Sequence, residues 1–269
     1  MGNVGERRQE LLTSLGFRFG ANGPHAARTM MLDDLRVLLA HVHPKAAKSD
    51  YAAAVIDENI LGKPTRKSRE LAFRHLATLY ALELANPIFR ALRHLWAINE
   101  SAQPMLALAV ALARDPLLRS TQAFVLGQSI GAYLPRETVE SFLDATFPER
   151  FSPASLKSFA QNVGGTWMDA GYLPGRIRKY RSHPEVYPEA VTLLLFLAHL
   201  EGRSGQRLFT SDWIQLACKT TAELESLVIS AFHRGLLIFM NAGGVQEVRF
   251  PGYLTSAEEQ IQQEVSHVV

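Results

Sequence analysis

Proline and glycine divide the chain into short segments, and this punctuation is the feature that most constrains its fold. Within the segments, apolar residues recur every three or four positions, which is the repeat of an α-helix with one buried face. Asn86-Pro87 and Asp115-Pro116 each place a capping side chain directly before a proline, as at a helix N-terminus. Because the helices are short and the loops tight, residues 1–150 of the 269-residue chain predict a compact helical bundle.

The remainder of the chain has a different pattern, and residues 148–153 mark the best boundary. Near the end, residues 236–240 and 245–250 form two apolar or alternating runs joined by Asn and Gly, which predicts a β-hairpin preceded by two helices. That order is typical of a winged helix. The predicted fold class is mainly α, in three parts: a helical bundle over residues 1–150, a helix-turn-helix or winged-helix-like region with one β-hairpin over 151–254, and a polar tail over 255–269.

Composition excludes several classes of protein. The chain is 47% hydrophobic and 20% charged, as in an ordinary globular protein, and its net charge of +2 excludes a histone-like polycation. The longest apolar runs, residues 105–113 and 190–198, are far shorter than the roughly 20 residues that span a bilayer. Cys218 is the single cysteine, so it cannot form an internal disulfide, and we expect it to be a small buried residue. We expect a soluble cytoplasmic protein with no membrane partner.

Residues 155–181 combine a predicted helix with a basic run. On the face of this helix opposite its apolar residues, the side chains are small or polar. Gly171 is placed to end the helix. The run that follows has four cations and no acidic residue, and Tyr180 within it adds a ring that can stack. Basic side chains of this kind contact the phosphate backbone, whereas glutamine and asparagine can read adenine edges. The predicted DNA contacts of the segment are Lys157, Gln161, Asn162, Arg176, Arg178, Lys179 and Arg181.

A second basic cluster surrounds a predicted helix start at Thr65. Free amides at a helix N-terminus attract phosphate, and nearby cations add to that attraction. The alternative is a solvated helix face whose cations pair with Glu70 and its neighbours. The predicted contacts here are Lys63, Arg66, Lys67 and Arg69.

The sequence shows no pattern of catalytic or metal-binding residues. His41 and His43 stand near a helix end without acidic or cysteine partners at metal spacing. The adjacent carboxylates Asp33 and Asp34 point to different parts of a helix surface, whereas paired-carboxylate catalysis needs side chains that converge. The loop that starts at Gly202 lacks the ending of a phosphate loop. We therefore expect no enzymatic activity, no cofactor and no metal.

Three segments together resemble a known family. They are AQNVGGTWMDAGYLPGRIRKYR (residues 160–181), LFLAHLEGRSGQRLFTSDW (195–213) and ENILGKPTRKSR (58–69), and they resemble BrxA of the bacterial BREX phage-resistance systems. The resemblance implies an all-helical core likened to the antitermination factor NusB, helix-turn-helix-like parts and binding to double-stranded DNA. It also implies a non-enzymatic role beside the methyltransferase, ATPase and phosphatase-like components of the system. The family offers no catalytic set, so the DNA contacts above come from charge and spacing in this chain.

Two functions remain open. The first is a DNA-binding accessory protein of a BREX-type defence system, which binds double-stranded DNA mainly through the phosphate backbone and has other BREX components as partners. The second is a protein–protein adaptor within the defence complex without direct nucleic-acid contact. Its support is the low net charge and the carboxylates Glu223 and Glu225 on the outer face of the helix before the hairpin. RNA is a less favoured nucleic-acid partner, through the NusB likeness.

Overall fold

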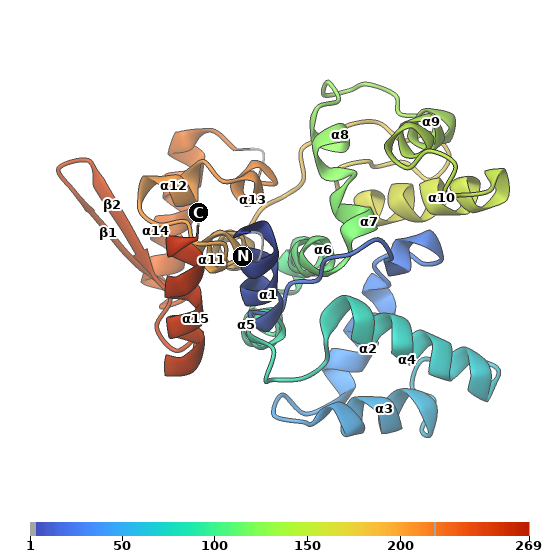
Figure 1. Ribbon diagram of the computed structural model, residues 1–269, viewed down its shortest axis with the longest axis horizontal. Coiled ribbons are helices and arrows are strands. Elements are labelled where there is room, and N and C mark those ends of the chain that lie inside the picture. The colour runs from blue at the N-terminus through green and yellow to red at the C-terminus, as the bar shows by residue number, and fades with distance from the viewer. Residues whose placement is uncertain (1–3, 218, 269) are drawn as a thin grey trace. The chain divides into compact units, whose positions relative to one another are not determined.

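The computed structural model describes residues 4–217 and 219–268, so Cys218 lies outside the described residues. The chain is mainly helical, with one two-stranded antiparallel hairpin near the C-terminus, which confirms the predicted fold class (Figure 1). It forms two compact units, and each unit gathers segments that are far apart in the sequence. The predicted parts 1–150, 151–254 and 255–269 are each one continuous stretch of sequence, unlike these two units. The assignment of separate functions to those parts stays a prediction.

Charge is distributed unequally between the two units. The unit made of Gly20–Leu84 and Val110–Pro184 has 18 Lys and Arg against 13 Asp and Glu, a net charge of +5. The unit made of Met1–Phe19, Ala85–Ala109 and Glu185–Val269 has 10 against 13, a net charge of −3. We call these the basic unit and the acidic unit. The small overall charge of +2 therefore conceals a basic half.

The basic unit is a set of helices around buried aromatic residues. Tyr51, Tyr80 and Trp167 are fully buried, and each lies on a different helix. Helices α9 and α10 pack against each other, as do α3 and α4. The elements are η1 (Pro24–Ala26), α2 (Leu32–His41), α3 (Lys48–Ile56), α4 (Arg66–Tyr80), α7 (Pro116–Arg119), α8 (Gln122–Leu126), α9 (Arg136–Thr146) and α10 (Pro153–Asp169), with the last residues of α6 (Gln103–Arg114).

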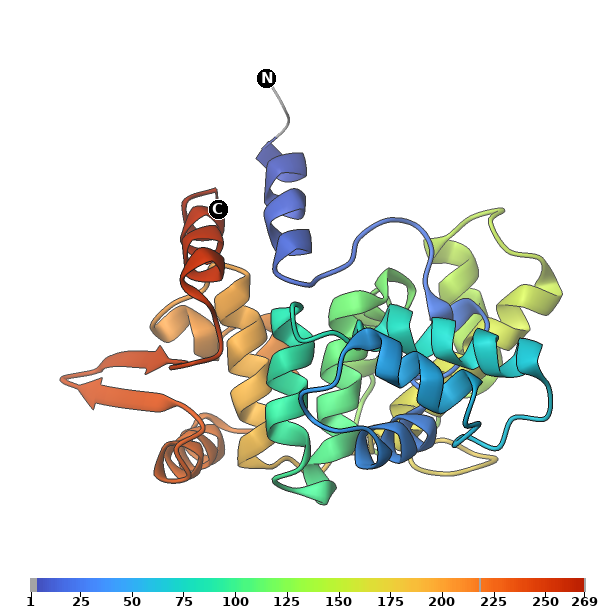
Figure 2. The same cartoon turned by 90° about the horizontal axis from the view of Figure 1, so that it is seen from below.

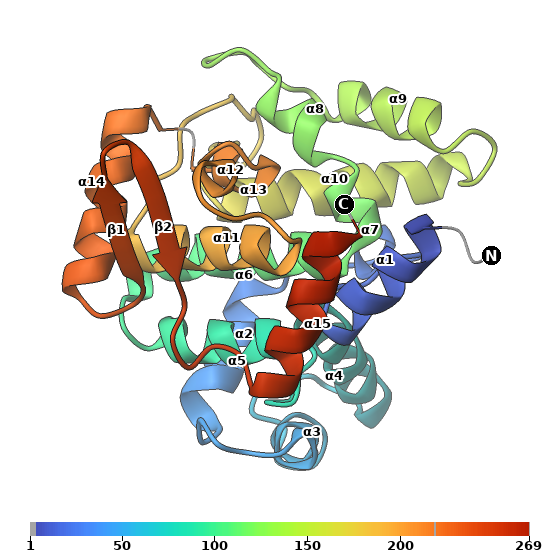
Figure 3. The same ribbon diagram turned by 60° about the vertical axis from the view of Figure 1, so that its left-hand side comes forward.

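The acidic unit is organised around one almost completely buried helix, α11 (Pro188–Leu200). Helices α5, α12, α13, α14 and α15 all pack against it, and Figure 3 shows the hairpin beside α14. Figure 2 shows the first and last helices of the chain, α1 and α15, side by side. The other elements of this unit are α1 (Val4–Ser14), α5 (Pro87–Trp96), η2 (Glu100–Ala102), the first residues of α6, α12 (Gln206–Phe209), α13 (Asp212–Gln215), α14 (Thr221–His233), β1 (Ile238–Ala242), β2 (Val245–Arg249) and α15 (Ser256–His267).

The helix starts follow the capping residues of the sequence. The Asn86 side chain accepts the Phe89 N–H at 3.0 Å, and Thr65 accepts the Ser68 N–H at 3.1 Å. These bonds satisfy amides that have no partner inside the helix. The order α13, α14 and hairpin is the one expected of a winged helix.

The hairpin turn is set by two glycines. Gly243 and Gly244 have φ values of +59° and +84°, which residues with a Cβ rarely adopt. Two left-handed residues in succession twist the chain in the sense that antiparallel strands need. Ala242 is therefore paired directly with Val245, and the register continues to Ile238 and Arg249.

A buried carboxylate ties three parts of the acidic unit together. Glu189, in the first turn of α11, has no exposed surface. It accepts hydrogen bonds from Arg234 Nη1 at 2.7 Å and from Asn99 Nδ2 at 3.3 Å. A buried charge needs such partners, since its hydration is lost on folding.

We predict that Glu189→Ala lowers the free energy of unfolding by about 2 kcal/mol, because it removes the fully buried acceptor of the hydrogen bonds from Arg234 and Asn99. Urea denaturation followed by circular dichroism measures this. Glu247→Ala is the matched control, since Glu247 pairs with Arg249 on the exposed hairpin and such pairs contribute little. Equal losses in the two variants would contradict the assignment.

Candidate nucleic-acid interface

Helix α10 positions the predicted contact residues. Ser152 accepts the Ser155 N–H at 3.2 Å, Pro153 occupies the first turn, and Gly171 follows the helix with φ of +84°. The buried face carries Phe159, Val163 and Trp167, as the helical spacing predicted. Gln161 and Lys157 are exposed.

Two adjacent glycines in the middle of α10 allow close packing on both sides of it. Glycine in a helix interior costs about 1 kcal/mol relative to alanine, so helix stability does not explain the pair. A Cβ on Gly164 would lie 3.3 Å from Lys179 Cε, and one on Gly165 would lie 3.0 Å from Thr29 Cγ2. The glycines therefore let the basic run and the loop before α2 approach the helix axis.

A pocket of about 310 Å³ lies between α9, α10 and the segment that follows α10. Its apolar lining comes largely from Leu134, Val139, Ala160, Leu173 and Ile177. Its polar lining is Gln161, Arg176 and Lys179, three of the predicted contacts, together with Arg136. The structure thus brings the polar face of α10 and the basic run to one concave site.

Arg176 and Arg178 are the cations of the basic run that point to solvent. Both are exposed, as is Lys157, and within the described chain none of the three side chains has an ion-pair or hydrogen-bond partner. Ile177 between them is 92% exposed. Unpaired guanidinium and ammonium groups are available to phosphate at no cost of breaking an existing pair.

Arg181 does not belong to this exposed set, which corrects the prediction. Its side chain is buried, its Nε donates to the Val125 carbonyl at 3.0 Å, and another nitrogen donates to the Ser182 carbonyl. The guanidinium also lies 5.3 Å from the centre of the Tyr172 ring. Arg181 therefore holds the basic run against α8, and its charge is not presented to a ligand.

Lys179 has an intermediate role. Its Nζ donates to the Gly175 carbonyl at 3.1 Å and lies 3.2 Å from Met168 Sδ. Partial burial lowers the pKa of Lys179, while the nearby Asp169 carboxylate acts in the opposite direction. Lys179 lines the pocket, but its ammonium group already donates a hydrogen bond within the loop.

Asn162 is the second correction. Its Nδ2 donates to the His25 carbonyl at 3.1 Å, and the side chain is half-buried. Successive helix positions are about 100° apart, so Asn162 faces the protein while Gln161 faces the pocket. Of the two predicted base readers, Gln161 alone is on the exposed face.

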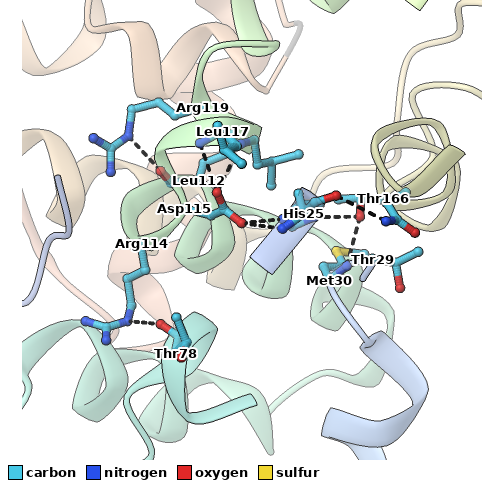
Figure 4. Close-up of polar contacts among 12 residues, drawn as sticks. His25, Thr29, Met30, Thr78, Leu112, Arg114, Asp115, Leu117, Arg119 and Thr166 are labelled. Carbon is cyan, nitrogen blue, oxygen red and sulfur yellow. Dashed lines mark hydrogen bonds and ion pairs between the residues drawn. The ribbon is translucent and has the colours of Figure 1, made fainter. Parts of the chain in front are cut away.

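The loop before α2 is fixed by a buried polar network that sequence reasoning missed. Asp115 Oδ2 accepts both the backbone N–H and the ring Nδ1 of His25 at 2.8 Å, and the ring Nε2 lies 2.8 Å from Thr166 Oγ1 (Figure 4). Thr166 Oγ1 also accepts the Met30 N–H at 2.8 Å. His25, Asp115 and Thr166 have no exposed surface, so this acid–imidazole–hydroxyl chain links η1, α7 and α10 and is closed to a substrate.

Asp115 also caps helix α7, and its surroundings lower its pKa. Asp115 Oδ1 accepts the Leu117 N–H at 2.9 Å and so caps α7, as its position before Pro116 predicted. Burial by itself raises the pKa of Asp115, but the hydrogen bonds and charge of His25 outweigh it, so the pKa lies below its usual value. Asp115 is thus held as a carboxylate.

The second predicted cluster is largely neutralised. Lys63 Nζ pairs with Asp34 at 2.9 Å, and Arg66 pairs with Glu70 at 3.0 Å and Asp57 at 3.4 Å. Lys67 is exposed and Arg69 is half-buried. The alternative of a solvated face that pairs with Glu70 therefore describes Arg66, and Lys67 is the freely exposed cation among the four predicted contacts.

Acidic residues also surround this second cluster. A pocket of about 420 Å³ beside Lys63 is lined by Asp33, Asp34 and Asp169 as well as Arg28. Burial, and then the charge of Asp33, raise the pKa of Asp169. Among the residues that the structure describes, no group of three His, Cys, Asp or Glu side chains is arranged to hold a metal ion. Carboxylates at this site repel phosphate, so the stronger candidate surface is the one on α10.

No protein-family model matches the chain, and no curated protein matches it. In the described part of the chain, no helix combines the length and the apolar character that crossing a bilayer requires.

We predict that Arg181→Met lowers the free energy of unfolding by about 2 kcal/mol, because it removes the hydrogen bonds of the buried guanidinium to the Val125 and Ser182 carbonyls. Arg178→Met, a change of the same size three residues away, should have little effect on unfolding, because Arg178 is exposed. Thermal denaturation of both variants measures the difference. A stable Arg181→Met protein would return Arg181 to the candidate contact set.

The Asp115 network predicts a dependence of stability on pH. Because the folded pKa of Asp115 is depressed, its contribution is complete above its usual pKa of about 4 and is lost as pH falls through the folded value. Asp115→Asn should lower the free energy of unfolding near neutral pH and make its fall below pH about 4 shallower than in the parent protein. Urea denaturation across this pH range tests this, and parallel curves would contradict it.

Proposed function

We propose that the basic unit binds double-stranded DNA, mainly through the phosphate backbone. The observation that carries the proposal is the set of exposed side chains Lys157, Arg176 and Arg178, which have no partner in the described chain, and Arg176 lines the α10 pocket. The net charge of +5 on this unit adds a longer-range attraction for a polyanion. Nothing in this chemistry requires a reaction, so the proposed role is non-enzymatic.

Sequence preference in this proposal is weak. Phosphate contacts fix register and affinity but carry little information about bases. Gln161 is the one predicted base reader on the exposed face, and an amide pairs best with adenine. A single amide at the pocket cannot specify a long site, so we propose binding to many sequences with similar affinity.

The resemblance of residues 58–69, 160–181 and 195–213 to BrxA supports a biological setting for this activity. We propose that the protein is an accessory component of a BREX-type phage-defence system in the cytoplasm and has other BREX components as partners. Arg176 and Arg178, two of the three exposed cations, lie in the segment 160–181 that resembles BrxA. The likeness and the charge argument therefore point to the same segment.

We predict that Arg176→Gln with Arg178→Gln weakens binding to duplex DNA of unrelated sequences by a similar factor. Each lost phosphate contact should also reduce the slope of log affinity against log salt concentration by about 0.9. Fluorescence anisotropy with labelled duplexes at several salt concentrations measures both quantities. Arg181 is omitted from the variant because its loss would disturb the fold.

The matched control is Arg203→Gln with Arg207→Gln, which removes the same charge from two exposed arginines of the acidic unit. It should leave the affinity and the salt slope nearly unchanged. An equal loss in both double variants would mean that net charge, and not the α10 surface, determines binding. Competition with duplex RNA distinguishes DNA from RNA as the preferred partner.

A protein–protein adaptor is the second candidate, and exposed apolar residues on two neighbouring elements of the acidic unit favour it. Ile229 and Phe232 of α14 are 40% and 42% exposed, and Ile238 and Met240 of the adjacent strand β1 are 36% and 41% exposed. Patches of this kind on a protein surface mark contact sites. Absence of duplex binding at low salt would favour the adaptor over the DNA-binding protein.

A further inference from the structure

Two tyrosines are presented together at the edge of the basic run. The segments 131–134 and 179–181 run antiparallel, and Tyr133 pairs with Tyr180 in an isolated β-bridge. The Leu134 N–H donates to the Lys179 carbonyl at 2.9 Å, and the Arg181 N–H donates to the Ala132 carbonyl at 2.9 Å. These bonds flank the tyrosine pair, which is the closely spaced kind of antiparallel pair with both side chains on one face.

Both rings are exposed. Tyr133 is 51% and Tyr180 42% exposed, and their ring centres lie 5.5 Å apart at 43°. Tyr51, Tyr80 and Tyr172 have no exposed surface at all. Packing of the core thus does not account for the exposed pair, because rings left in water contribute little of their burial energy to folding.

Hydrogen bonds and a tight turn hold the backbone that carries Tyr180. Arg181, next to Tyr180, is anchored on the Val125 carbonyl, and the Tyr180 N–H donates to the Pro174 carbonyl at 3.1 Å. Gly175 has φ of +111°, and a Cβ there would lie 1.9 Å from the Arg178 carbonyl oxygen, so the loop closes tightly. A platform that is already ordered loses little conformational entropy when a ligand binds.

The chemistry around the rings selects a particular ligand. Arg176 and Arg178 belong to the same loop and are unpaired in the described chain. Residues 127–135 and 170–184, the sequence segments that carry the two tyrosines, contain no Asp or Glu. Exposed aromatic faces beside free cations suit a ligand with flat apolar groups on an anionic backbone, which is a nucleic acid with unpaired bases.

We propose that Tyr133 and Tyr180 form a stacking platform for unpaired bases, so that the basic unit binds single-stranded segments as well as the duplex backbone. Bases inside a duplex are stacked on one another and cannot offer their faces to a protein ring. The platform therefore adds affinity only where strands are separated. This inference rests on the proposed nucleic-acid binding of the same surface.

The experiment compares an oligothymidylate of about 12 nucleotides with a duplex of similar length. Tyr133→Leu with Tyr180→Leu keeps apolar side chains but removes both rings, and Tyr133→Phe with Tyr180→Phe keeps the rings. By anisotropy, the leucine pair should bind the single strand about tenfold or more weakly, with duplex affinity changed less than about twofold. The phenylalanine pair should bind both as the parent does.

A second measurement reports stacking directly. An oligothymidylate with one 2-aminopurine should lose fluorescence when it binds the parent or the phenylalanine pair, and lose much less with the leucine pair at saturation. Equal melting temperatures for the variants, measured by circular dichroism, establish that folding is not the cause.

The outcomes separate this inference from the proposed function. Duplex binding with no single-strand binding, or a leucine pair that binds the single strand as the parent does, overturns the platform and leaves the phosphate surface standing. Equal losses for single strand and duplex in the leucine pair also overturn it, because the rings would then act on a feature common to both. Failure of the parent protein to bind either probe overturns both proposals.

Discussion

The buried guanidinium of Arg181 determines where the candidate surface lies. It is bonded to carbonyl oxygens of Val125 and Ser182 and packs on the Tyr172 ring, so the chain on either side of it has little freedom. A charge that is removed from water must be surrounded by acceptors, and few arrangements of the backbone supply them. Arg181 therefore fixes the end of the basic run beside Tyr180, whereas Arg176 and Arg178 are exposed. Within a single basic run, one arginine holds the structure and its neighbours are left for a ligand.

Helix α10 has a comparable division between its two sides. On the inner side, Thr166 and Asn162 bond to the loop that carries His25, and Asp115 completes the network. On the outer side, Gln161 and the two glycines form the floor of the pocket. The inner network contains hydrogen bonds of 2.8 Å between groups with no exposure, and such groups are costly to separate. The outer side can therefore be polar and open without loss of the helix position.

Local features of the fold were predictable from the sequence, and the roles of individual polar residues were not. Capping by Asn86, Thr65 and Asp115 depends on bonds within a few residues, and the hairpin depends on two adjacent glycines. The sequence pattern does not distinguish Arg178 from Arg181. Arg181 is buried against the Val125 carbonyl, which lies 56 residues away in the sequence. The partner of Asp115 Oδ2 is likewise 90 residues away, so the capping pattern revealed one oxygen of that carboxylate and not the other.

Charge and stacking contribute to the candidate surface over different distances. The excess of cations on the basic unit acts over about 10 Å at moderate salt and attracts any polyanion, which gives affinity without choice. The rings of Tyr133 and Tyr180 act only in contact, and only on bases that have left the duplex. Salt weakens the first effect far more than the second. A surface with both would therefore bind DNA broadly at low salt and become selective for opened strands as salt rises. Such a surface would distinguish the state of the strands more than their sequence.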